Sequence, residues 1–269
     1  VEKCSYLCTI NLCNPRMLSK NKQKYVRSLA LKKHRDAQGV FIAEGPKVVG
    51  DLLPLLPCVL LCATPQYLAT HPAVQAEEVE EVDERTLAQI SQLTTAHEVL
   101  AVFRRPQPTT ADLVALARTQ LCLALDGVQD PGNVGTMVRI ADWFGIEHLF
   151  CSRDTADVFS PKTVQATMGA IGRVQVHQVD LAEWVKALPQ DVPVYATTLE
   201  GRNLYTEALT PTGVVVMGNE GRGISTEVMN QVNRQLFIPN YPAERATSES
   251  LNVAIATAIV CGEFRRRLV

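Results

Sequence analysis

Apolar and polar positions alternate in two successive blocks along the chain, and each block predicts short strands and helices in turn. The first block opens with a helical pattern over Asn21–Ala37, where Tyr25 and Leu29 belong to an apolar stripe among basic residues. The other elements predicted there are the strands Val40–Ala43, Val59–Ala63 and Val99–Phe103 and the helices Lys47–Leu53 and Thr86–Gln92. This alternation is typical of a compact α/β domain.

The second block begins at Leu121 and has more apolar strands. Leu121–Leu125 is apolar throughout, which predicts a strand buried on both faces of a sheet, and the helix predicted over Asn133–Phe144 is ended by Gly145. The remaining strands are predicted at His148–Cys151, Val174–Gln178, Val194–Thr197, Val214–Met217 and Leu236–Ile238, and the remaining helices at Pro161–Met168, Leu181–Leu188, Thr226–Val232 and Ser250–Arg266. The order predicts a mostly parallel sheet with helices on both faces.

These blocks divide the chain into domains. We expect a first domain over residues 17–106, which ends in the proline-containing stretch Arg104–Thr110, a linker over 107–120 that begins within this stretch, and a second domain over 121–269. Residues 1–16 contain no initiator methionine and no basic segment before an apolar core. They are interpreted as a disordered or non-native leader, with Met17 as the natural start.

Composition narrows the class of protein. The chain has 269 residues, of which 46% are hydrophobic and 20% charged, and no apolar run approaches the roughly 18 residues of a membrane span. Its eight cysteines form no CxxC pair, so we expect free thiols in a reducing cytoplasm and no bound metal. A formal net charge of −2 gives no general attraction to nucleic acid.

The charges are nevertheless unevenly placed. Seven basic residues lie between Met17 and Asp36, and an acidic run follows near residue 80. The candidate RNA contacts in this basic segment are Lys32, Lys33 and Arg35. The alternative is an ordinary solvated helix face.

Ligands of parallel sheets bind at the carboxyl ends of strands, and the first loop to consider there is DGVQDPGN. Asp130, Pro131 and Gly132 form a turn before the helix, and Asn133 can cap that helix. Arg139 lies further along the same helix. The alternative interpretation makes Asn133 only a cap and Arg139 only a partner of Asp142.

The second loop, MGNEGRGIS, has glycines at 218, 221 and 223, which indicate a sharply bent backbone or close approach of a ligand. It matches neither a Walker loop nor the GxGxxG dinucleotide pattern. Glu220 is therefore a candidate that faces a ligand, and the alternative is an exposed loop carboxylate.

The third loop leads from Ile238 into the last helix, whose first turn contains Ser248, Ser250 and Asn252. Capping explains either serine, but it leaves Asn252 without a structural reason.

Together and in this order, the three loops resemble the signature motifs of the SpoU branch of the SPOUT superfamily. The matching segments are NVGTMVR at 133–139, GNEGRG at 218–223 and SLNVAIA at 250–256. The resemblance covers about Leu121–Phe264. The first domain more loosely resembles the family's L30e-like substrate-binding domain, through Leu29–Val49 and Val99–Phe103.

The resemblance implies an S-adenosylmethionine-dependent methyltransferase that acts on a ribose 2′-hydroxyl of RNA. It implies a parallel sheet with a trefoil knot, a homodimer with the site near the subunit interface, and no metal. The implied cofactor contacts are Thr197, Gly201, Gly218, Ile238, Leu251 and Asn252. The residues implied to face the RNA are Asn133, Arg139, Glu220, Ser250 and Asn252.

Methyl transfer is an in-line displacement, so the enzyme must align the reacting atoms and exclude water. Arg139 is the family's usual candidate for accepting the hydroxyl proton, but a guanidinium stays protonated at neutral pH. We expect Arg139 to hold an RNA phosphate, while that phosphate or Glu220 assists the proton. None of the five histidines occupies a motif position.

A different class of protein is also compatible with these residues, namely a non-catalytic RNA-binding or ribosome-assembly factor with the same fold. The separate first domain favours ribosomal RNA over transfer RNA as the partner, because such domains accompany recognition of folded loops. The loop between Ile238 and Ser250 is longer and more charged than we expect of the family.

Overall fold

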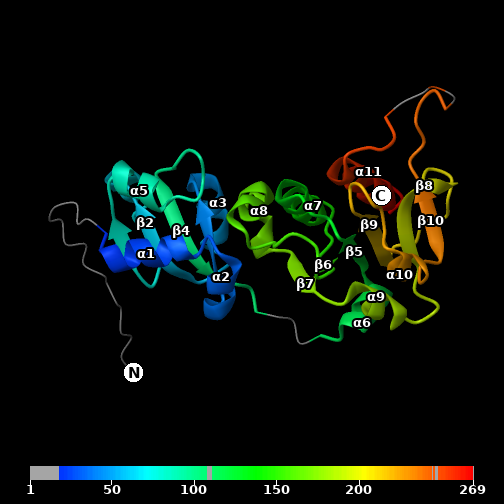
Figure 1. Ribbon diagram of the computed structural model, residues 1–269, viewed down its shortest axis with the longest axis horizontal. Coiled ribbons are helices and arrows are strands. Elements are labelled where there is room, and N and C mark those ends of the chain that lie inside the picture. Colours follow the sequence, from blue (N-terminus) through cyan, green and yellow to red (C-terminus); the bar gives the residue numbers. More distant parts are fainter. Residues whose placement is uncertain (1–17, 108–110, 244, 246–247, 269) are drawn as a thin grey trace.

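In a computed structural model, which describes residues 18–107, 111–243, 245 and 248–268, the chain forms two α/β units side by side (Figure 1). The predicted leader over 1–16 lies outside the described residues. Among the described residues, no helix is long and apolar enough to cross a membrane.

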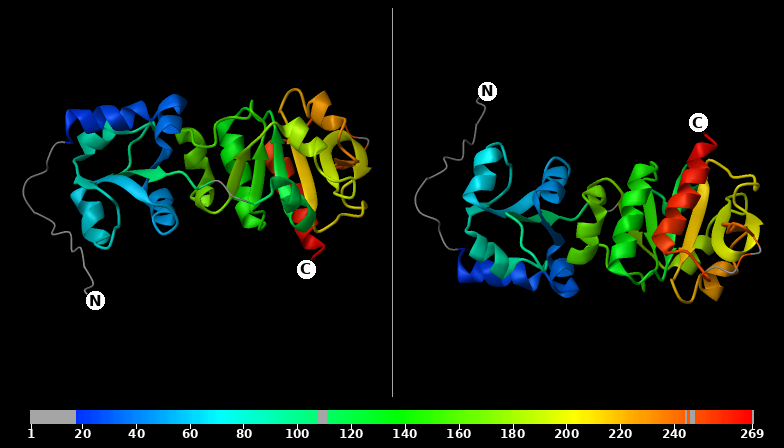
Figure 2. Two further views of the ribbon diagram at one scale, coloured as in Figure 1. Left: turned by 90° about the horizontal axis from the view of Figure 1, so that it is seen from below. Right: turned by 90° about the horizontal axis from the view of Figure 1, so that it is seen from above.

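The N-terminal unit is built on a mixed sheet with the strand order β1-β4-β2-β3. Both β1 (Val40–Glu44) and β2 (Cys58–Ala63) are antiparallel to β4 (Val99–Arg104), whereas β3 (Val79–Glu81) is parallel to β2. The helices of this unit are α1 (Lys20–Ser28), α2 (Lys32–Gln38), α3 (Pro46–Leu52), α4 (Pro65–Thr70) and α5 (Glu84–Ile90). They lie on both sides of the sheet (Figure 2).

The first predicted helix is in fact two helices. α1 ends at Ser28, and Leu31 has the extended backbone of an N-cap residue, φ −91° and ψ 130°, before α2 begins. The break lets Leu29 stay buried in the core with Val26, while α2 turns away in a new direction. Helix α4 and strand β3 were not predicted; α4 begins where Thr64 caps a helix with Pro65 in its first turn.

The C-terminal unit has a six-stranded sheet in the order β10-β8-β9-β5-β6-β7, and each strand is parallel to its neighbour. Its strands are β5 (Leu121–Asp126), β6 (His148–Cys151), β7 (Gln175–Gln178), β8 (Val194–Asn203), β9 (Gly213–Gly218) and β10 (Arg234–Phe237). All six residues of β5 are buried, and the apolar run Leu121–Leu125 predicts this for the first five. The predicted parallel sheet is confirmed.

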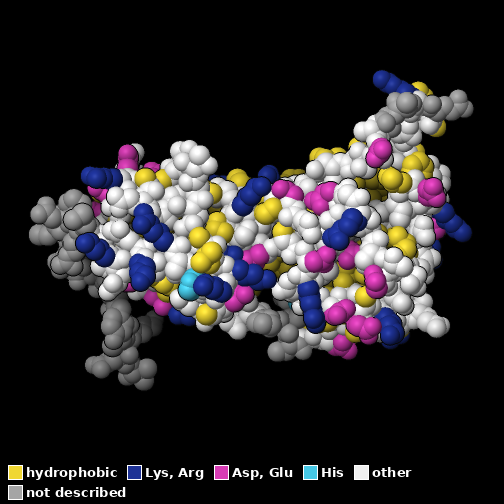
Figure 3. Space-filling view, in the orientation of Figure 1, with side chains coloured by type: hydrophobic (Ala, Val, Ile, Leu, Met, Phe, Trp, Pro, Cys, Tyr) yellow, Lys and Arg dark blue, Asp and Glu magenta, His cyan; other side chains and the backbone are white. Residues whose placement is uncertain are grey.

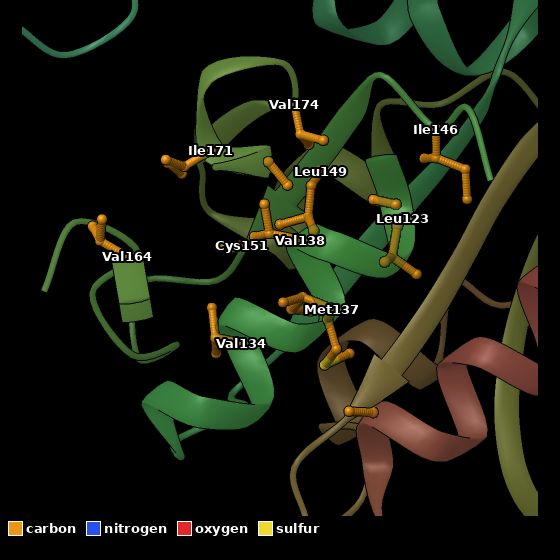
Figure 4. Packing of buried hydrophobic residues seen from close by; sticks show 14 of the residues in the cluster. Leu123, Val134, Met137, Val138, Ile146, Leu149, Cys151, Val164, Ile171 and Val174 are labelled. Atoms are coloured by element: carbon orange, nitrogen blue, oxygen red, sulfur yellow. The ribbon is translucent and has the colours of Figure 1, made fainter. Parts of the chain in front are cut away.

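Helices cover both faces of this sheet because its strands present apolar side chains alternately to each face. On one face Leu123 and Leu125 pack with α7 (Pro131–Trp143), α8 (Pro161–Thr167), the 3-10 turn η1 (Ala170–Gly172) and α11 (Val253–Arg266). Figure 4 shows Met137 and Val138 of α7 facing Leu123 and Leu149 of the sheet.

On the other face Cys122 and Ala124 pack with α6 (Leu113–Thr119), α9 (Leu181–Lys186) and α10 (Thr226–Met229). The segment predicted as a linker therefore includes a helix, α6. Its N-cap is Asp112, whose side chain accepts a hydrogen bond from the backbone N–H of Val114. The indole N–H of Trp184 donates to the carbonyl of Leu113 at 3.2 Å and joins α6 to α9.

Candidate active site

The polar loops meet at the carboxyl edge of the C-terminal sheet. β5 and β9 are neighbours, and their last residues, Asp126 and Gly218, are paired in register. The first loop therefore leaves the sheet beside the glycine loop. Helix α11 packs against α7 and brings its N-terminus to the same edge.

A chain of hydrogen bonds joins one side chain from each motif. The Asn133 Nδ2 donates to Glu220 Oε1 at 2.9 Å, and the Asn252 Nδ2 donates to Asn133 Oδ1 at 3.0 Å. The other Glu220 oxygen accepts from the backbone N–H of Gln129 at 3.4 Å. Residues separated by 87 and 119 positions in the sequence are thus in direct contact.

The helix caps differ from those predicted. Helix α7 begins at Pro131, and its N-cap is Asp130, whose side chain accepts from the backbone N–H of Asn133 at 2.8 Å. This hydrogen bond, together with Lys162, holds the pKa of the Asp130 carboxyl below its ordinary value. Because Asp130 takes the capping role, the amide of Asn133 remains available for Glu220 and Asn252.

Asn252, which capping was expected to leave unexplained, is itself the N-cap of α11. Its Oδ1 accepts from the backbone N–H groups of Ala254 and Ile255 at 3.0 and 3.2 Å. The cap fixes the amide oxygen toward the helix, so the Nδ2 points to Asn133.

Asn219 organises the glycine loop from within, and sequence reasoning missed it. Its Oδ1 accepts from the backbone N–H groups of Gly221 and Arg222, both at 2.9 Å, and its Nδ2 donates to the carbonyl of Gly127 at 2.7 Å. A Cβ on Gly218 would lie 2.4 Å from the carbonyl carbon of Gly223, so the loop closes tightly over that glycine.

Asp126 is a second residue that the sequence analysis did not single out. This buried carboxylate accepts from the backbone N–H of Ser225 at 2.6 Å and ties the far end of the glycine loop to β5. The sequence signal was the first residue of the DGVQDPGN loop, an acidic residue at the end of an apolar strand.

Arg139 and Ser250 are not part of the hydrogen-bond chain. Arg139 is exposed on α7 and has no hydrogen-bond or ion-pair partner among the residues that the structure describes. Its expected alternative partner, Asp142, accepts instead from the Arg173 guanidinium at 2.7 Å, so that alternative is wrong. Ser250 is exposed just before α11.

The predicted cofactor contacts lie around the same edge. Strand β8 pairs with β10 through Tyr195 and Ala196, and resumes only at Arg202, so the intervening segment with Thr197 and Gly201 leaves the ladder. The Thr197 hydroxyl donates to the carbonyl of Val216 at 3.0 Å. The other predicted contacts are half-buried Gly218 and Ile238 and exposed Leu251 and Asn252.

A polar hollow of 630 Å³ lies elsewhere on the C-terminal unit. Its lining includes Arg202, Glu207 and Arg234, and Gly201 is its one residue among the predicted cofactor contacts. Glu207 already accepts from both arginines at 3.3 Å. The hollow therefore does not coincide with the hydrogen-bond chain of Asn133, and we do not assign the methyl-transfer site to it.

The predicted RNA contacts separate into two groups. Lys32 and Lys33 are exposed on α2, and Lys and Arg side chains gather over α1 and α2 on the face shown in Figure 3. Arg35 is instead 2% exposed and donates to Asp157 of the C-terminal unit at 2.5 Å. The expectation that Arg35 contacts RNA does not fit this placement, because the turn between α1 and α2 directs its side chain inward.

The described residues contain no group of three or more His, Cys, Asp or Glu side chains that could hold a metal ion. The five described cysteines are buried free thiols, whereas Cys4, Cys8 and Cys13 lie outside the described residues. Away from the site, His148 and His177 are in contact at 3.0 Å, and burial and the neighbouring histidine lower the pKa of His177 to about 4.

Two family models match the two units. Residues 120–262 match the SpoU rRNA Methylase family, and residues 20–101 match the MRM3-like substrate binding domain. A curated relative from Bacillus subtilis, the 23S rRNA (guanosine(2553)-2′-O)-methyltransferase RlmP, is 29% identical over 260 residues, covering 91% of this chain and 96% of the relative.

Several solved structures are similar to this chain over nearly its full length. A protein from Porphyromonas gingivalis assigned to the TrmH family of RNA methyltransferases is 44% identical, with a TM-score of 0.79, over 93% of this chain and 99% of that one. An S-adenosylmethionine-bound rRNA methyltransferase from Sinorhizobium meliloti is 33% identical, with a TM-score of 0.77, over 94% and 97%. With a family model that matches more than half of its residues, this chain belongs to the SpoU rRNA methylase family.

Proposed function

We propose that this protein transfers a methyl group from S-adenosylmethionine to a ribose 2′-hydroxyl of RNA, and of ribosomal RNA in preference to transfer RNA. The observation that carries the proposal is the hydrogen-bond chain from Asn252 through Asn133 to Glu220, which brings three family motifs to one edge of the sheet. The rRNA methyltransferases among the relatives and structural neighbours support the choice of RNA.

The residues at this edge fit S-adenosylmethionine. An adenosine needs apolar walls beside backbone hydrogen-bonding groups. Leu199, in the segment of β8 that leaves the ladder, and Leu251, just before α11, are 67% and 49% exposed. We propose that Thr197, Gly201, Gly218, Ile238, Leu251 and Asn252 hold the cofactor. When bound, it supplies an electrophilic methyl group on a sulfonium ion. The trefoil knot implied by the family resemblance remains part of this proposal.

The polar side chains orient the ribose in this proposal. Asn133, Glu220 and Asn252 present amide and carboxylate groups that are already fixed by one another, so little ordering remains when the sugar binds. Ser250, exposed beside them, adds a hydroxyl for the RNA backbone. The proton of the attacking hydroxyl passes to Glu220 or to the adjacent RNA phosphate.

Arg139 holds that phosphate. Its guanidinium is exposed and has no partner among the described residues, and its planar fork matches two phosphate oxygens. Lys32 and Lys33 on α2 supply further contacts to the RNA backbone. We propose that residues 17–106 bind the RNA substrate and that 121–269 carry out the transfer.

We further propose that two copies of the chain act as a homodimer. Trp143 of α7 and Ile255 of α11 are 83% and 55% exposed, and the two helices pack against each other. Large apolar side chains at such exposure are typical of an interface. Arg139 lies one helical turn before Trp143, so the contact between copies comes close to the phosphate-holding group. The five buried free thiols fit a cytoplasmic location.

The test is methyl transfer by purified protein to ribosomal and transfer RNA, with Arg139→Ala as the variant and Arg173→Ala as the matched control. We expect Arg139→Ala to lower transfer about a hundredfold while cofactor affinity stays within about twofold of wild type. Arg173 lies on the same unit but is already paired with Asp142, so its removal leaves transfer near wild type.

Equal loss of cofactor affinity and transfer in Arg139→Ala contradicts the role given to Arg139. RNA binding by the wild type without methyl transfer to any RNA contradicts the catalytic proposal itself and favours the non-catalytic RNA-binding alternative.

A further inference from the structure

Arg35 is a buried charge between the two units. Its NH1 donates to the carbonyls of Leu29 and Ala30 at 2.6 and 2.7 Å, and its NH2 donates to Asp157 Oδ2 at 2.5 Å. Its Nε is buried without a hydrogen-bond partner among the described residues. The only carboxylate paired with this guanidinium in the described part of the chain therefore comes from the other unit.

Asp157 is held in place by the residues that lead into α8. Its Oδ1 accepts from the backbone N–H of Phe159 at 3.0 Å, and its carbonyl accepts from the hydroxyl of Thr163 in α8 at 2.9 Å. The Asp157 side chain is 17% exposed. The ion pair with Arg35 thus connects α2 of the N-terminal unit to the start of α8.

A second contact lies beside the ion pair. The ring of Phe159 packs against Phe41 of β1 with 5.4 Å between the ring centroids. The guanidinium carbon of Arg105 lies over the Phe159 ring, 4.6 Å from its centroid. Arg105 also pairs with Asp36 of α2 at 2.8 Å. An aromatic and a charged contact therefore support the same junction.

The far end of α8 is equally close to the N-terminal unit. A Cβ on Gly169 would lie 2.6 Å from the Asp51 Cβ of α3, and one on Gly172 would lie 2.9 Å from the Leu52 Cδ2. Both glycines let the units approach where a side chain would separate them. Figure 1 shows α8 between α3 and α7.

On its opposite side α8 packs directly on α7. A Cβ on Gly135 of α7 would lie 2.5 Å from both the Ala166 Cβ and the carbonyl oxygen of Thr163. The same helix α7 carries Asn133 at its N-terminus, and Lys162 of α8 pairs with its cap, Asp130, at 3.4 Å. A displacement of α8 is consequently transmitted to the residue that contacts Glu220.

We propose that Arg35 and Asp157 are positioning residues, which hold α2 against α8 and thereby determine which nucleotide of the RNA reaches Asn133. Helix α2 directs Lys32 and Lys33 outward and Arg35 inward, so the helix that holds RNA is joined by one ion pair to the unit that methylates it. Neither residue touches RNA or cofactor. The inference rests on the proposed methyltransferase function, and it adds a determinant of site selectivity.

A purely structural role is the competing account, because an unpaired buried charge destabilises any fold. The test therefore uses three variants, Asp157→Asn, Arg35→Met and the double variant Arg35→Met with Asp157→Asn. The double variant removes both charges and keeps the volumes, so its thermal stability recovers relative to the single variants. Asp191→Asn, which breaks the exposed pair with Arg118, is the matched control.

Three measurements are made on the full chain: cofactor affinity by calorimetry, ribose methylation of ribosomal RNA mapped at each nucleotide, and the interatomic distance distribution by small-angle X-ray scattering. We expect the double variant to bind S-adenosylmethionine within about twofold of wild type, to lose roughly tenfold in rate at the main target, and to methylate neighbouring nucleotides. We also expect its distance distribution to broaden. Asp191→Asn should match wild type throughout.

A double variant that methylates the same single nucleotide as wild type, at an unchanged rate, overturns the proposal. An unchanged distance distribution overturns the claim that the pair fixes the two units, and this arm needs no methyl transfer. A wild type that methylates no RNA instead contradicts the proposed function, which is a separate result.

Discussion

The two sheets of this protein differ in where they place polar side chains. In the C-terminal sheet every described strand is parallel to its neighbours, and the loops that follow β5 and β9 leave from one edge. In the N-terminal sheet β1, β2 and β3 run in one direction and β4 runs antiparallel to β1 and β2, so the segment after β4 leaves from the opposite edge. The parallel sheet collects Asn133 and Glu220 at one place, whereas Lys32 and Lys33 lie on a helix surface.

This difference teaches where substitutions should matter. Side chains that converge on one edge depend on each other's position, so the loops around them tolerate little change in volume. Charges on a helix surface act nearly independently and are screened by salt. Substitutions at the carboxyl edge of the C-terminal sheet should therefore have large and abrupt effects, and those of the exposed charges on α2 small and additive ones.

Gly218→Ala should produce the largest effect. Its Cβ would lie 2.4 Å from Gly223 and 2.5 Å from Ile224, both backbone atoms that cannot rotate away. We expect the glycine loop to shift and methyl transfer to fall about a hundredfold or more. Gly221→Ala is the matched control, because its nearest neighbour is 3.8 Å away. Equal activity of the two variants in a transfer assay would contradict the claim that side chains at this edge depend on each other's position.

Gly135→Ala tests how tightly α7 packs on α8, and Gly50→Ala in the N-terminal unit is the comparison. A Cβ there would lie 2.5 Å from Ala166 and Thr163, and we expect a loss of about 3 kcal/mol of unfolding free energy. Gly50→Ala in α3 has nothing within 4 Å, and better helix propensity should stabilise it by about 0.5 kcal/mol. Denaturant titration of both variants measures the difference, and effects of equal sign would contradict it.

The paired histidines His148 on β6 and His177 on β7 should make the stability of the C-terminal unit depend on pH. Burial lowers the pKa of His177 to about 4 from an ordinary value of 6.5, so between these values the unfolded chain binds protons that the folded chain does not. Stability from this group is complete above pH 6.5 and is lost as the pH falls toward 4. We expect His177→Gln to reduce that loss of stability in urea titrations, because a glutamine does not titrate. An identical pH profile for the variant would refute this.

Neutralising the surface lysines should have the smallest effect. Lys32→Ala and Lys33→Ala should each weaken RNA binding by about 1 kcal/mol or less, lower the salt dependence by about one unit of slope, and add in the double variant. Lys47→Ala, an exposed lysine paired with Asp51 on α3, is the control. A cooperative loss in fluorescence anisotropy titrations would mean that these charges act together, as the joined side chains Asn133, Glu220 and Asn252 do.

Sequence patterns predicted the C-terminal unit better than the N-terminal one for a physical reason. A strand buried on both faces, such as β5 with its run Leu121–Leu125, has a continuous apolar sequence that few other elements share. The break between α1 and α2, and the short β3, depend on contacts with the rest of the unit. An apolar stripe alone does not report such contacts, so the pattern over Asn21–Ala37 indicated one helix.

The site was predictable in its motifs but not in its internal bonds. Asn133, Glu220 and Asn252 were identified from sequence, whereas Asn219 and Asp126 were not, because their partners are backbone groups. A hydrogen bond to a distant backbone atom leaves no mark on local periodicity. The burial of Arg35 was hidden for a similar reason, since its partner Asp157 is 122 positions away.

Asp130 and Asn133 are both able to cap α7, and in this structure Asp130 does so. Asparagine is as good a helix cap as aspartate, so in a chain without the Asp130 carboxylate the amide of Asn133 becomes the nearest substitute for an unsatisfied helix terminus. The side chain of Asn133 would then cap the helix and would no longer contact Glu220 and Asn252. Substitution of Asp130 is therefore expected to lower methyl transfer, although this carboxylate only caps a helix and pairs with Lys162.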